Sequence, residues 1–273
     1  MPAPTNEPAR HLQTGDGENS PAATAPSELK YSDIASLVED AGLDIRGAFH
    51  PLKSDGVPPF SDGRSVATLF LIGNEGRRMW PFFTASKEAR DHQAHPLDRF
   101  SRRIVSRIAA RLEAVALFPF DGPPWLPFLR WAQKAGPLFP SPIGPLIHPV
   151  FGLWHAFRGA LGFHRRIELP AADSQATGAD DDRWPCRNCI ERPCLKACPA
   201  EAFASKRYDA DQCTMHLRSD AGKDCVGFGC LARRACPIGK AFTYSPSQSE
   251  FHTRAFLAAA PPRRSDPSAS KGV

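Results

Sequence analysis

The sequence predicts an α/β domain followed by a small cysteine-rich domain. In the first part of the chain, apolar runs typical of buried strands alternate with patterns typical of helices, which is the order of elements in an α/β core. All eight cysteines then lie between Cys186 and Cys236. With 273 residues, 42% of them hydrophobic, the chain is long enough for one medium-sized domain and a small appendage.

The first expected elements are a short helix and two strands. Apolar residues stand at helical spacing after Ser32, so a helix is expected from there to about Gly42. Residues 43–49 alternate between apolar and polar side chains, as in a strand with one buried face. After a loop rich in proline and glycine, the apolar run 66–73 predicts a strand that is buried on both faces.

Two helices are expected next, at 84–92 and 96–112. The second has a continuous apolar stripe, formed by Phe100, Ile104, Ile108 and Leu112. A ridge of arginines runs beside the stripe and consists of Arg99, Arg103, Arg107 and Arg111. Such an arginine ridge is typical of a solvated helix face, and its alternative use is a contact with phosphate, RNA or an acidic protein.

The α/β domain is expected to end with four further elements. A strand at 115–120 stops at Asp121, which precedes Gly-Pro-Pro, and a helix at 126–135 stops before a glycine–proline pair. A β-hairpin with an aromatic turn follows at 145–161, and a closing strand at 166–170.

Composition divides the chain into five segments. They are a disordered tail at 1–28, the α/β domain at 29–172, a linker at 173–183, a cluster domain at 184–245 and a second disordered tail at 259–273. The tails are poor in large apolar side chains and cannot bury enough surface to become ordered. The longest apolar run is too short and too rich in proline to span a bilayer, and no secretory signal is found near the start. We therefore expect a cytoplasmic protein with no membrane segment.

The cysteines form two groups that each end in Cys-Pro. The first group is Cys186, Cys189, Cys194 and Cys198, and the second is Cys213, Cys225, Cys230 and Cys236. Four thiolates can hold one [4Fe–4S] cluster, and in ferredoxins with two clusters the fourth cysteine of a run ligates the other cluster. The pattern therefore predicts a ferredoxin-type domain with two [4Fe–4S] clusters. One cluster would take a first set, Cys186, Cys189, Cys194 and Cys236; the other would take a second set, Cys198, Cys213, Cys225 and Cys230.

Disulfides and structural zinc are the alternative uses of these cysteines. Disulfides require an oxidising compartment, which the lack of a secretory signal disfavours. Zinc also takes four thiolates, usually from two short C-x2–4-C knuckles, whereas this chain has paired Cys-Pro endings and an isolated Cys213. The spacing departs from the bacterial ferredoxin run, because four residues instead of two precede Cys194 and five separate Cys230 from Cys236. The second group is the more stretched of the two.

Several motifs occur together in the order found in one known family. They are Phe120-Asp-Gly-Pro-Pro, the helix end Ala132-Gln-Lys-Ala-Gly, the segment 147–154 and the cysteine layout closing on Cys-Pro. In this combination the chain resembles epoxyqueuosine reductase, a cobalamin-dependent family with two [4Fe–4S] clusters. The segment 147–159 also resembles the cobalamin-processing chaperone of the CblC type. The resemblance implies a nitroreductase-like α/β domain followed by a ferredoxin-like iron–sulfur domain.

The resemblance also implies a site in the α/β domain. Asp121 stands where epoxyqueuosine reductase has a proton-donating aspartate, and Arg158 matches a CblC arginine that handles a thiol co-substrate. His148 and Trp154 belong to the shared segment and are the further candidates for cofactor binding. Without the resemblance, Asp121 is a turn former, His148 a strand-edge group and Arg158 a partner for aromatic rings.

The sequence is therefore interpreted as that of an iron–sulfur oxidoreductase. Its cluster domain would pass electrons to a pocket in the α/β domain, with cobalamin as the candidate second cofactor. The expected partner is an electron-donor protein of the flavodoxin or ferredoxin reductase type. RNA is a weaker candidate partner, suggested by the arginine ridge and by the tRNA substrate of the resembled family. The alternative is a ferredoxin-type electron carrier or a cobalamin-handling chaperone with no turnover of its own.

Overall fold

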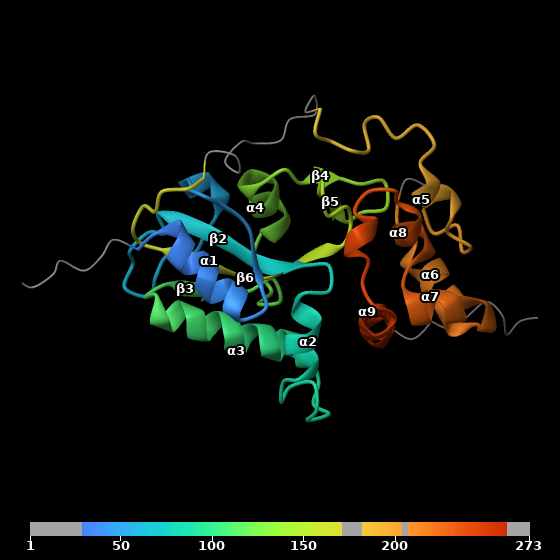
Figure 1. Cartoon of the computed structure of the whole chain (residues 1–273), viewed down its shortest axis with the longest axis horizontal. Helices are drawn as coiled ribbons and strands as arrows, with labels where there is room; N and C mark the ends of the chain where they lie inside the picture. Colours follow the sequence, from blue (N-terminus) through green and yellow to red (C-terminus); the bar gives the residue numbers. More distant parts are fainter. Residues whose placement is uncertain (1–28, 171–181, 204–206, 261–273) are drawn as a thin grey trace, which may run out of the picture.

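The computed structural model describes residues 29–170, 182–203 and 207–260, and it contains an α/β unit followed by a unit that carries the cysteines (Figure 1). The helices of the α/β unit are α1 (Tyr31–Asp40), η1 (Lys53–Asp55), α2 (Met79–Thr84), α3 (Pro96–Arg111) and α4 (Phe128–Ala135). Its strands are β1 (Asp44–Phe49), β2 (Thr68–Glu75), β3 (Val115–Leu117), β4 (Phe139–Pro140), β5 (Leu146–Ile147) and β6 (His155–Phe163).

The main sheet has the strand order β1-β2-β6-β3, and all neighbouring strands are antiparallel. Helices α1 and α3 cover one face and α4 covers the other (Figure 1). Successive residues of β2 alternate between the two faces, so that Phe70 packs with α1 and α3 while Leu71 packs with α4. The expected mixed α/β fold, with a strand buried on both faces, is confirmed.

An irregularity in the sheet displaces Arg158 from the pairing of β2 with β6. Ile72 pairs with Gly159, but the next residue, Gly73, pairs with Phe157. One residue of β6 is therefore left without a partner, as in a β-bulge. A bulge of this kind changes the direction of the side chain that it displaces, and here it affects a predicted site residue.

Five expected elements lie close to their observed bounds. They are the helices at 32–42, 96–112 and 126–135 and the strands at 43–49 and 66–73. The strand expected at 115–120 is shorter, because regular pairing with β6 ends at Leu117. The helix expected at 84–92 is wrong, since α2 ends at Thr84 and turns follow it.

The expected hairpin at 145–161 and strand at 166–170 are also wrong. β5 pairs with β4 and β6 pairs with β2 and β3, so a single bridge between His148 and Gly152 closes the turn between them. Ile167 is buried, but its N–H group donates to the Thr68 hydroxyl at 2.9 Å rather than to a neighbouring strand. A side chain thus replaces a sheet hydrogen bond at this position.

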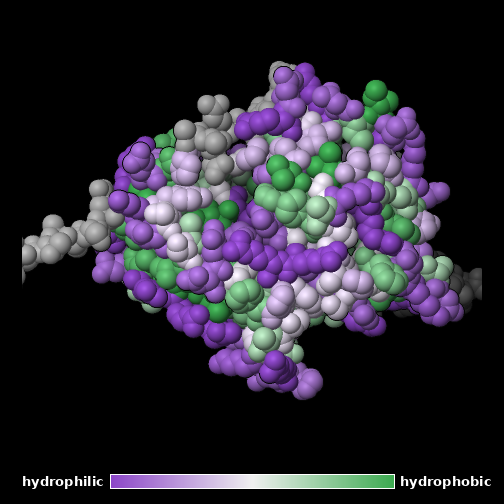
Figure 2. Space-filling model, viewed as in Figure 1, coloured by the Kyte–Doolittle hydropathy of each residue, from purple (hydrophilic) through white to green (hydrophobic). Residues whose placement is uncertain are grey.

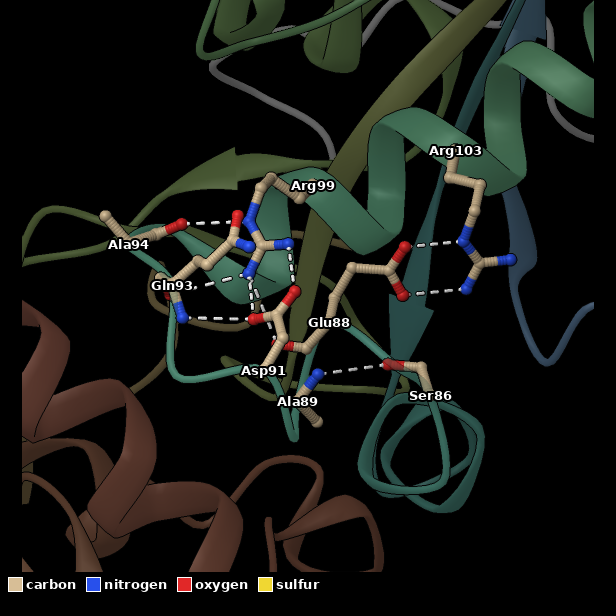
Figure 3. Close-up of polar contacts among 8 residues, drawn as sticks. All are labelled: Ser86, Glu88, Ala89, Asp91, Gln93, Ala94, Arg99 and Arg103. Atoms are coloured by element: carbon tan, nitrogen blue, oxygen red, sulfur yellow. Dashed lines mark hydrogen bonds and ion pairs between the residues drawn. The ribbon is translucent and has the colours of Figure 1, made fainter.

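Half of the arginine ridge holds the segment after α2 (Figure 3). Arg99 makes two hydrogen bonds to the Asp91 carboxylate, at 2.6 and 2.7 Å, and Arg103 makes two to Glu88, at 2.6 and 2.9 Å. Only 4% of the Glu88 side chain is exposed. The hydrogen bond from Arg103 is the main cause that lowers the Glu88 pKa to about 2. Two arginines of the ridge are therefore internal partners, whereas Arg107 and Arg111 are exposed.

The described residues of the cysteine-bearing unit, 182–203 and 207–260, form short helices joined by turns and contain no strand. Its elements are α5 (Pro193–Lys196), α6 (Ala210–Arg218), η2 (Asp220–Gly222), α7 (Lys223–Phe228), α8 (Leu231–Ala235), η3 (Lys240–Phe242) and α9 (Pro246–Ala259). The sequence did not predict α9, whose apolar residues form no continuous stripe. This helix lies between α2 and α7 (Figure 1).

Helix α9 contacts both units. The Phe251 ring lies 5.5 Å from Trp80 and 5.1 Å from Phe83 of α2, and Thr253 donates to the Cys225 carbonyl at 3.4 Å. The chain therefore returns from the cysteines to the α/β unit before its last helix ends.

Two glycines bring the backbones of the two units into contact. Gly152 has φ +59° and Gly239 has φ +74°. A Cβ atom on Gly152 would lie 2.1 Å from the Ile238 carbonyl oxygen, and one on Gly239 would lie 2.3 Å from the Phe151 carbonyl carbon. Only glycine fits this backbone contact, which we call the glycine junction.

The expected tail at 1–28 and most of the expected linker at 173–183 lie outside the described residues. The second tail was expected from Ala259, which is the last residue of α9; residues 261–273 are not described. On the face drawn in Figure 2, hydrophilic residues predominate and hydrophobic ones form separate patches. None of the described helices combines the length and the apolar character that crossing a membrane requires.

Candidate metal centre

The eight cysteines surround two cavities. One cavity, of about 240 Å³, is lined by all four cysteines of the first set: Cys186, Cys189, Cys194 and Cys236. The other, of about 450 Å³, is lined by all four cysteines of the second set: Cys198, Cys213, Cys225 and Cys230. The fold thus brings together the same two sets into which the Cys-Pro endings divide the sequence.

Short helices position the cysteines. Cys194 lies in α5, Cys213 in α6 and Cys225 in α7, while Cys230 and Cys236 flank α8. Helices α5 and α8 contact each other. Cys236, after α8, thereby joins Cys194 in the first set, and Cys198, after α5, joins Cys230 in the second.

The two cavities are close neighbours within one packed core. Cys194 of the first set and Cys230 of the second belong to the same cluster of side chains as Ile147 of β5. Gly229, with φ +86°, allows the chain to turn sharply between α7 and α8. The small sheet of β4 and β5 therefore supports both cysteine sets.

The electrostatic interactions follow the same division. Burial and then the charges of Cys236, Cys194 and Cys189 raise the pKa of Cys186 to about 11. Burial also raises the pKa of Cys213, and the charges of Cys198 and Cys225 add to this effect. Neighbouring thiols with raised pKa values suit a cationic partner. Coordination to a cation deprotonates the thiols and offsets the repulsion between the thiolates.

The donor sets fit an iron–sulfur cluster better than disulfides or single ions. All eight cysteines are free, so no disulfide joins them. Among the described residues, no three His, Cys, Asp or Glu side chains are placed so that they could hold a single metal ion. Four thiols around a wider cavity suit a cubane of four irons, which spreads its ligands further apart than one zinc ion does.

The larger cavity extends from the second set to the α/β unit. Trp154 lines it, together with three residues that no sequence motif indicated: Arg233, Tyr244 and His252. The Arg233 guanidinium lies 4.4 Å from the Trp154 ring and 4.6 Å from the Tyr244 ring, and its Nε donates to the Leu153 carbonyl at 3.0 Å. Arg233 thereby ties α8 to the start of β6.

Arg158 lies near this wall of the cavity. Its Nε is buried and has no hydrogen-bond partner among the described residues. Burial lowers the pKa of Arg158, and the charge of Arg158 helps to lower the pKa of His252 to about 3, after burial as the main cause. A buried guanidinium with an unused donor is able to bind an acceptor group of a ligand.

His148 is placed in a different environment. Its ring lies 4.3 Å from Phe151, and its Nδ1 accepts the backbone N–H groups of Val150 and Phe151 at 3.0 and 3.3 Å. Burial and the charge of Arg46 lower the pKa of His148 to about 4. The imidazole is therefore neutral at pH 7, and its Nδ1 is already used within the chain.

Asp121 lies on the surface and lines neither cysteine cavity. Its side chain is 45% exposed and forms an ion pair with Arg102, whose second contact to the carboxylate is 3.3 Å. The Arg102 guanidinium also lies over the Phe118 ring at 4.6 Å. The structure thus brings Trp154 to the second cysteine set but leaves Asp121 and His148 apart from it.

Comparison with known proteins adds one finding. No protein-family model and no curated protein sequence matches the chain. Among solved structures, the chain is similar to epoxyqueuosine reductase. This is also the family that its motifs resemble.

Three such structures illustrate the extent of the similarity. A crystal structure of epoxyqueuosine reductase with an epoxyqueuosine-modified tRNA-Tyr stem loop has 13% identity and a TM-score of 0.41, over 79% of this chain and 66% of that one. The Bacillus subtilis epoxyqueuosine reductase has 14% identity and a TM-score of 0.39, over 80% and 70%. A selenomethionine-labelled epoxyqueuosine reductase has 13% identity and a TM-score of 0.37, over 80% and 68%. The chain thus spans just under two thirds of the length of the first of these proteins.

Proposed function

We propose that this protein is an iron–sulfur oxidoreductase with two [4Fe–4S] clusters. The observation that carries the proposal is the pair of neighbouring cavities, each lined by four free thiols. The first set would hold one cluster and the second set the other. Bound clusters of this type exchange single electrons at low potential.

The positions of the two cysteine sets would determine the path of the electrons through the protein. The cavity of the first set is lined by Ile147 and Ile238 but not by Trp154 or Arg233, whereas the cavity of the second set is lined by both Trp154 and Arg233. We infer that electrons arrive from a donor protein at the first set and leave through the second set toward the α/β unit. A donor of the flavodoxin or ferredoxin reductase type remains our proposed partner.

We further propose that the oxidoreductase is linked to a corrinoid. A bound corrinoid would carry the bond-breaking chemistry, while the protein binds and orients it. The cavity of about 450 Å³ is already shared with the second cysteine set, so a corrinoid would occupy it only in part, against Trp154 and near the unused Nε of Arg158. His148 and Asp121 line neither cavity, so they are the proposed contact and acid for the part of the corrinoid that extends beyond it. Asp121 would have to separate from Arg102 before it could deliver a proton.

Iron analysis tests the two-cluster proposal. Anaerobically purified protein should contain about eight irons and eight sulfides per chain, four of each per cluster. Cys189→Ser and Cys225→Ser each remove one ligand from one set, so each variant should lose the EPR signal of one cluster and keep that of the other. Zinc in place of iron, or equal loss of both signals in either variant, would contradict the assignment of two separate sets.

Titration of the reduced protein with hydroxocobalamin tests the corrinoid proposal. A change in the cobalt spectrum is expected, and Arg158→Met should weaken it because the buried donor is lost. Arg64→Met is the matched control. It removes an exposed arginine that stacks on Phe60, far from Arg158 in the sequence. Eight irons without any response to cobalamin would leave a ferredoxin-type electron carrier, and binding without substrate-dependent oxidation would leave a corrinoid chaperone.

A further inference from the structure

Arg233 places a positive charge in the wall of the larger cavity. The described residues that line this cavity include no other Arg or Lys and no Asp or Glu. Arg234, the next residue, forms an ion pair with Asp224. Within the described part of the chain Arg233 has no such carboxylate partner, so the protein does not neutralise its charge.

A backbone carbonyl and two aromatic rings hold the Arg233 guanidinium in place. Two of its nitrogens donate to the Leu153 carbonyl, Nε at 3.0 Å and Nη2 as the second donor. Its carbon atom Cζ lies 4.4 Å from the centre of the Trp154 ring and 4.6 Å from that of the Tyr244 ring. Ring faces attract a cation but carry no net charge. The position of the charge is therefore fixed, while the charge itself stays uncompensated.

The charge of Arg233 lies in the same cavity wall as all four cysteines of the second set. A cysteine that binds iron is deprotonated, so a loaded second set gathers negative charge beside the half-buried Arg233. The smaller cavity is different, because Arg192, the arginine that lines it, is exposed and water screens its charge. The second set is therefore the one with a partly desolvated cation beside it.

We propose that Arg233 is the counter-charge of the cluster held by the second set and raises the reduction potential of that cluster. The inference rests on the function proposed above. One electron supplied by a low-potential donor adds one negative charge to the cluster, and no bond is formed or broken. The attraction to a fixed cation grows with the added charge, so Arg233 stabilises the reduced form more than the oxidised form. The second set then becomes the preferred electron acceptor, next to Trp154.

Potentiometric titration of the full chain, monitored by EPR, tests this inference. Arg233→Gln removes the charge but keeps a side-chain amide that can donate to the Leu153 carbonyl. At a fixed potential, the ratio of reduced to oxidised second cluster should fall about tenfold in this variant, which corresponds to about 59 mV for a one-electron couple. Arg233→Lys keeps the charge and should restore most of the wild-type ratio.

Two further variants assign the shift and control for it. The shift should persist when Arg233→Gln is combined with Cys189→Ser, because Cys189 belongs to the first set and the second set stays intact. Arg254→Gln is the matched control. It removes an exposed arginine of the same unit that pairs with Glu250 and does not line the larger cavity, so both potentials should stay unchanged.

The outcomes separate this inference from the proposed function. A wild-type chain without iron would overturn the proposed function, and this inference with it. Iron at the expected level with unchanged potentials in Arg233→Gln would overturn the role of Arg233 alone, and so would a shift of equal size in Arg233→Lys or in Arg254→Gln. Loss of half the iron from both Arg233 variants would also overturn it, since the side chain would then be needed for packing rather than for its charge. Loss of iron from Arg233→Gln but not from Arg233→Lys would support the counter-charge, because the charge is what the two variants do not share.

Discussion

Replacing Gly152 by alanine should destabilise the protein and lower its iron content. An alanine at φ +59° carries a backbone penalty of about 1–2 kcal/mol. Its Cβ would also lie 2.1 Å from the Ile238 carbonyl oxygen, so the backbone must move, which costs about a further 1–3 kcal/mol. The expected total loss is about 2–5 kcal/mol. Because Ile238 lies two residues after Cys236, the same movement should disturb the first cysteine set.

Gly56 offers a matched control for this substitution. Its φ is +65°, close to that of Gly152, but the nearest atom to an added Cβ is an Arg130 nitrogen at 3.8 Å. Gly56→Ala should therefore lose only the backbone penalty and keep its iron. The measurement is anaerobic unfolding in guanidinium chloride, together with iron analysis of the folded variants. If the two variants lose equal stability and both keep full iron, the glycine junction does not couple the two units as we infer.

Three further predictions follow from the ion pairs, the buried histidines and the exposed arginines. Glu88→Gln should lower the free energy of unfolding by about 1–3 kcal/mol at pH 7. The Glu88 pKa falls from 4.5 to about 2 on folding, so the stabilisation from the ionised carboxylate is complete above pH 4.5 and declines as the pH falls toward 2. If the difference in stability from wild type does not shrink below pH 4.5 in denaturation curves, this prediction is wrong. Burial lowers the pKa of His155 from 6.5 to about 3, so the unfolded chain binds the proton first and the stability of the fold decreases as the pH drops below 6.5. His155→Gln should make the decrease of stability between pH 6.5 and 5 shallower. An unchanged slope of stability against pH would argue against this. Arg107→Glu with Arg111→Glu should weaken binding of an RNA stem loop in a gel-shift assay without loss of stability, whereas unchanged binding would remove the arginine ridge as an RNA surface.

The sequence predicted those parts of the fold that depend on local pattern. Helix α3 has a regular apolar stripe and begins with a proline, and β2 is a continuous apolar run, so both could be located closely. Helix α9 has no such stripe, because it contacts α2 on one side and α7 on the other and distributes its apolar residues accordingly. The helix expected after α2 failed for a related reason. Glu88 and Asp91 pair with arginines of α3, and these long-range ion pairs favour turns over a helix.

The candidate site shows the same distinction. The grouping of the cysteines follows from sequence spacing, since a Cys-Pro ending directs the fourth cysteine away from its own run. Arg233, three residues after Cys230, lies within that pattern, but nothing in it indicates that the guanidinium contacts both the Trp154 ring and the Tyr244 ring. The ion pair of Asp121 with Arg102 depends on how α3 packs beside β3, which the sequence pattern does not contain.

The interleaving of the two cysteine sets has a consequence for synthesis of the protein. The second set is complete once Cys230 has left the ribosome, whereas the first set also needs Cys236, although three of its members are made earliest. A nascent chain therefore exposes Cys186, Cys189 and Cys194 without their fourth partner while the second set can already close. If iron and sulfide are delivered during translation, the second set should receive its cluster before the first set. A chain terminated between Cys230 and Cys236 could then retain only the second site.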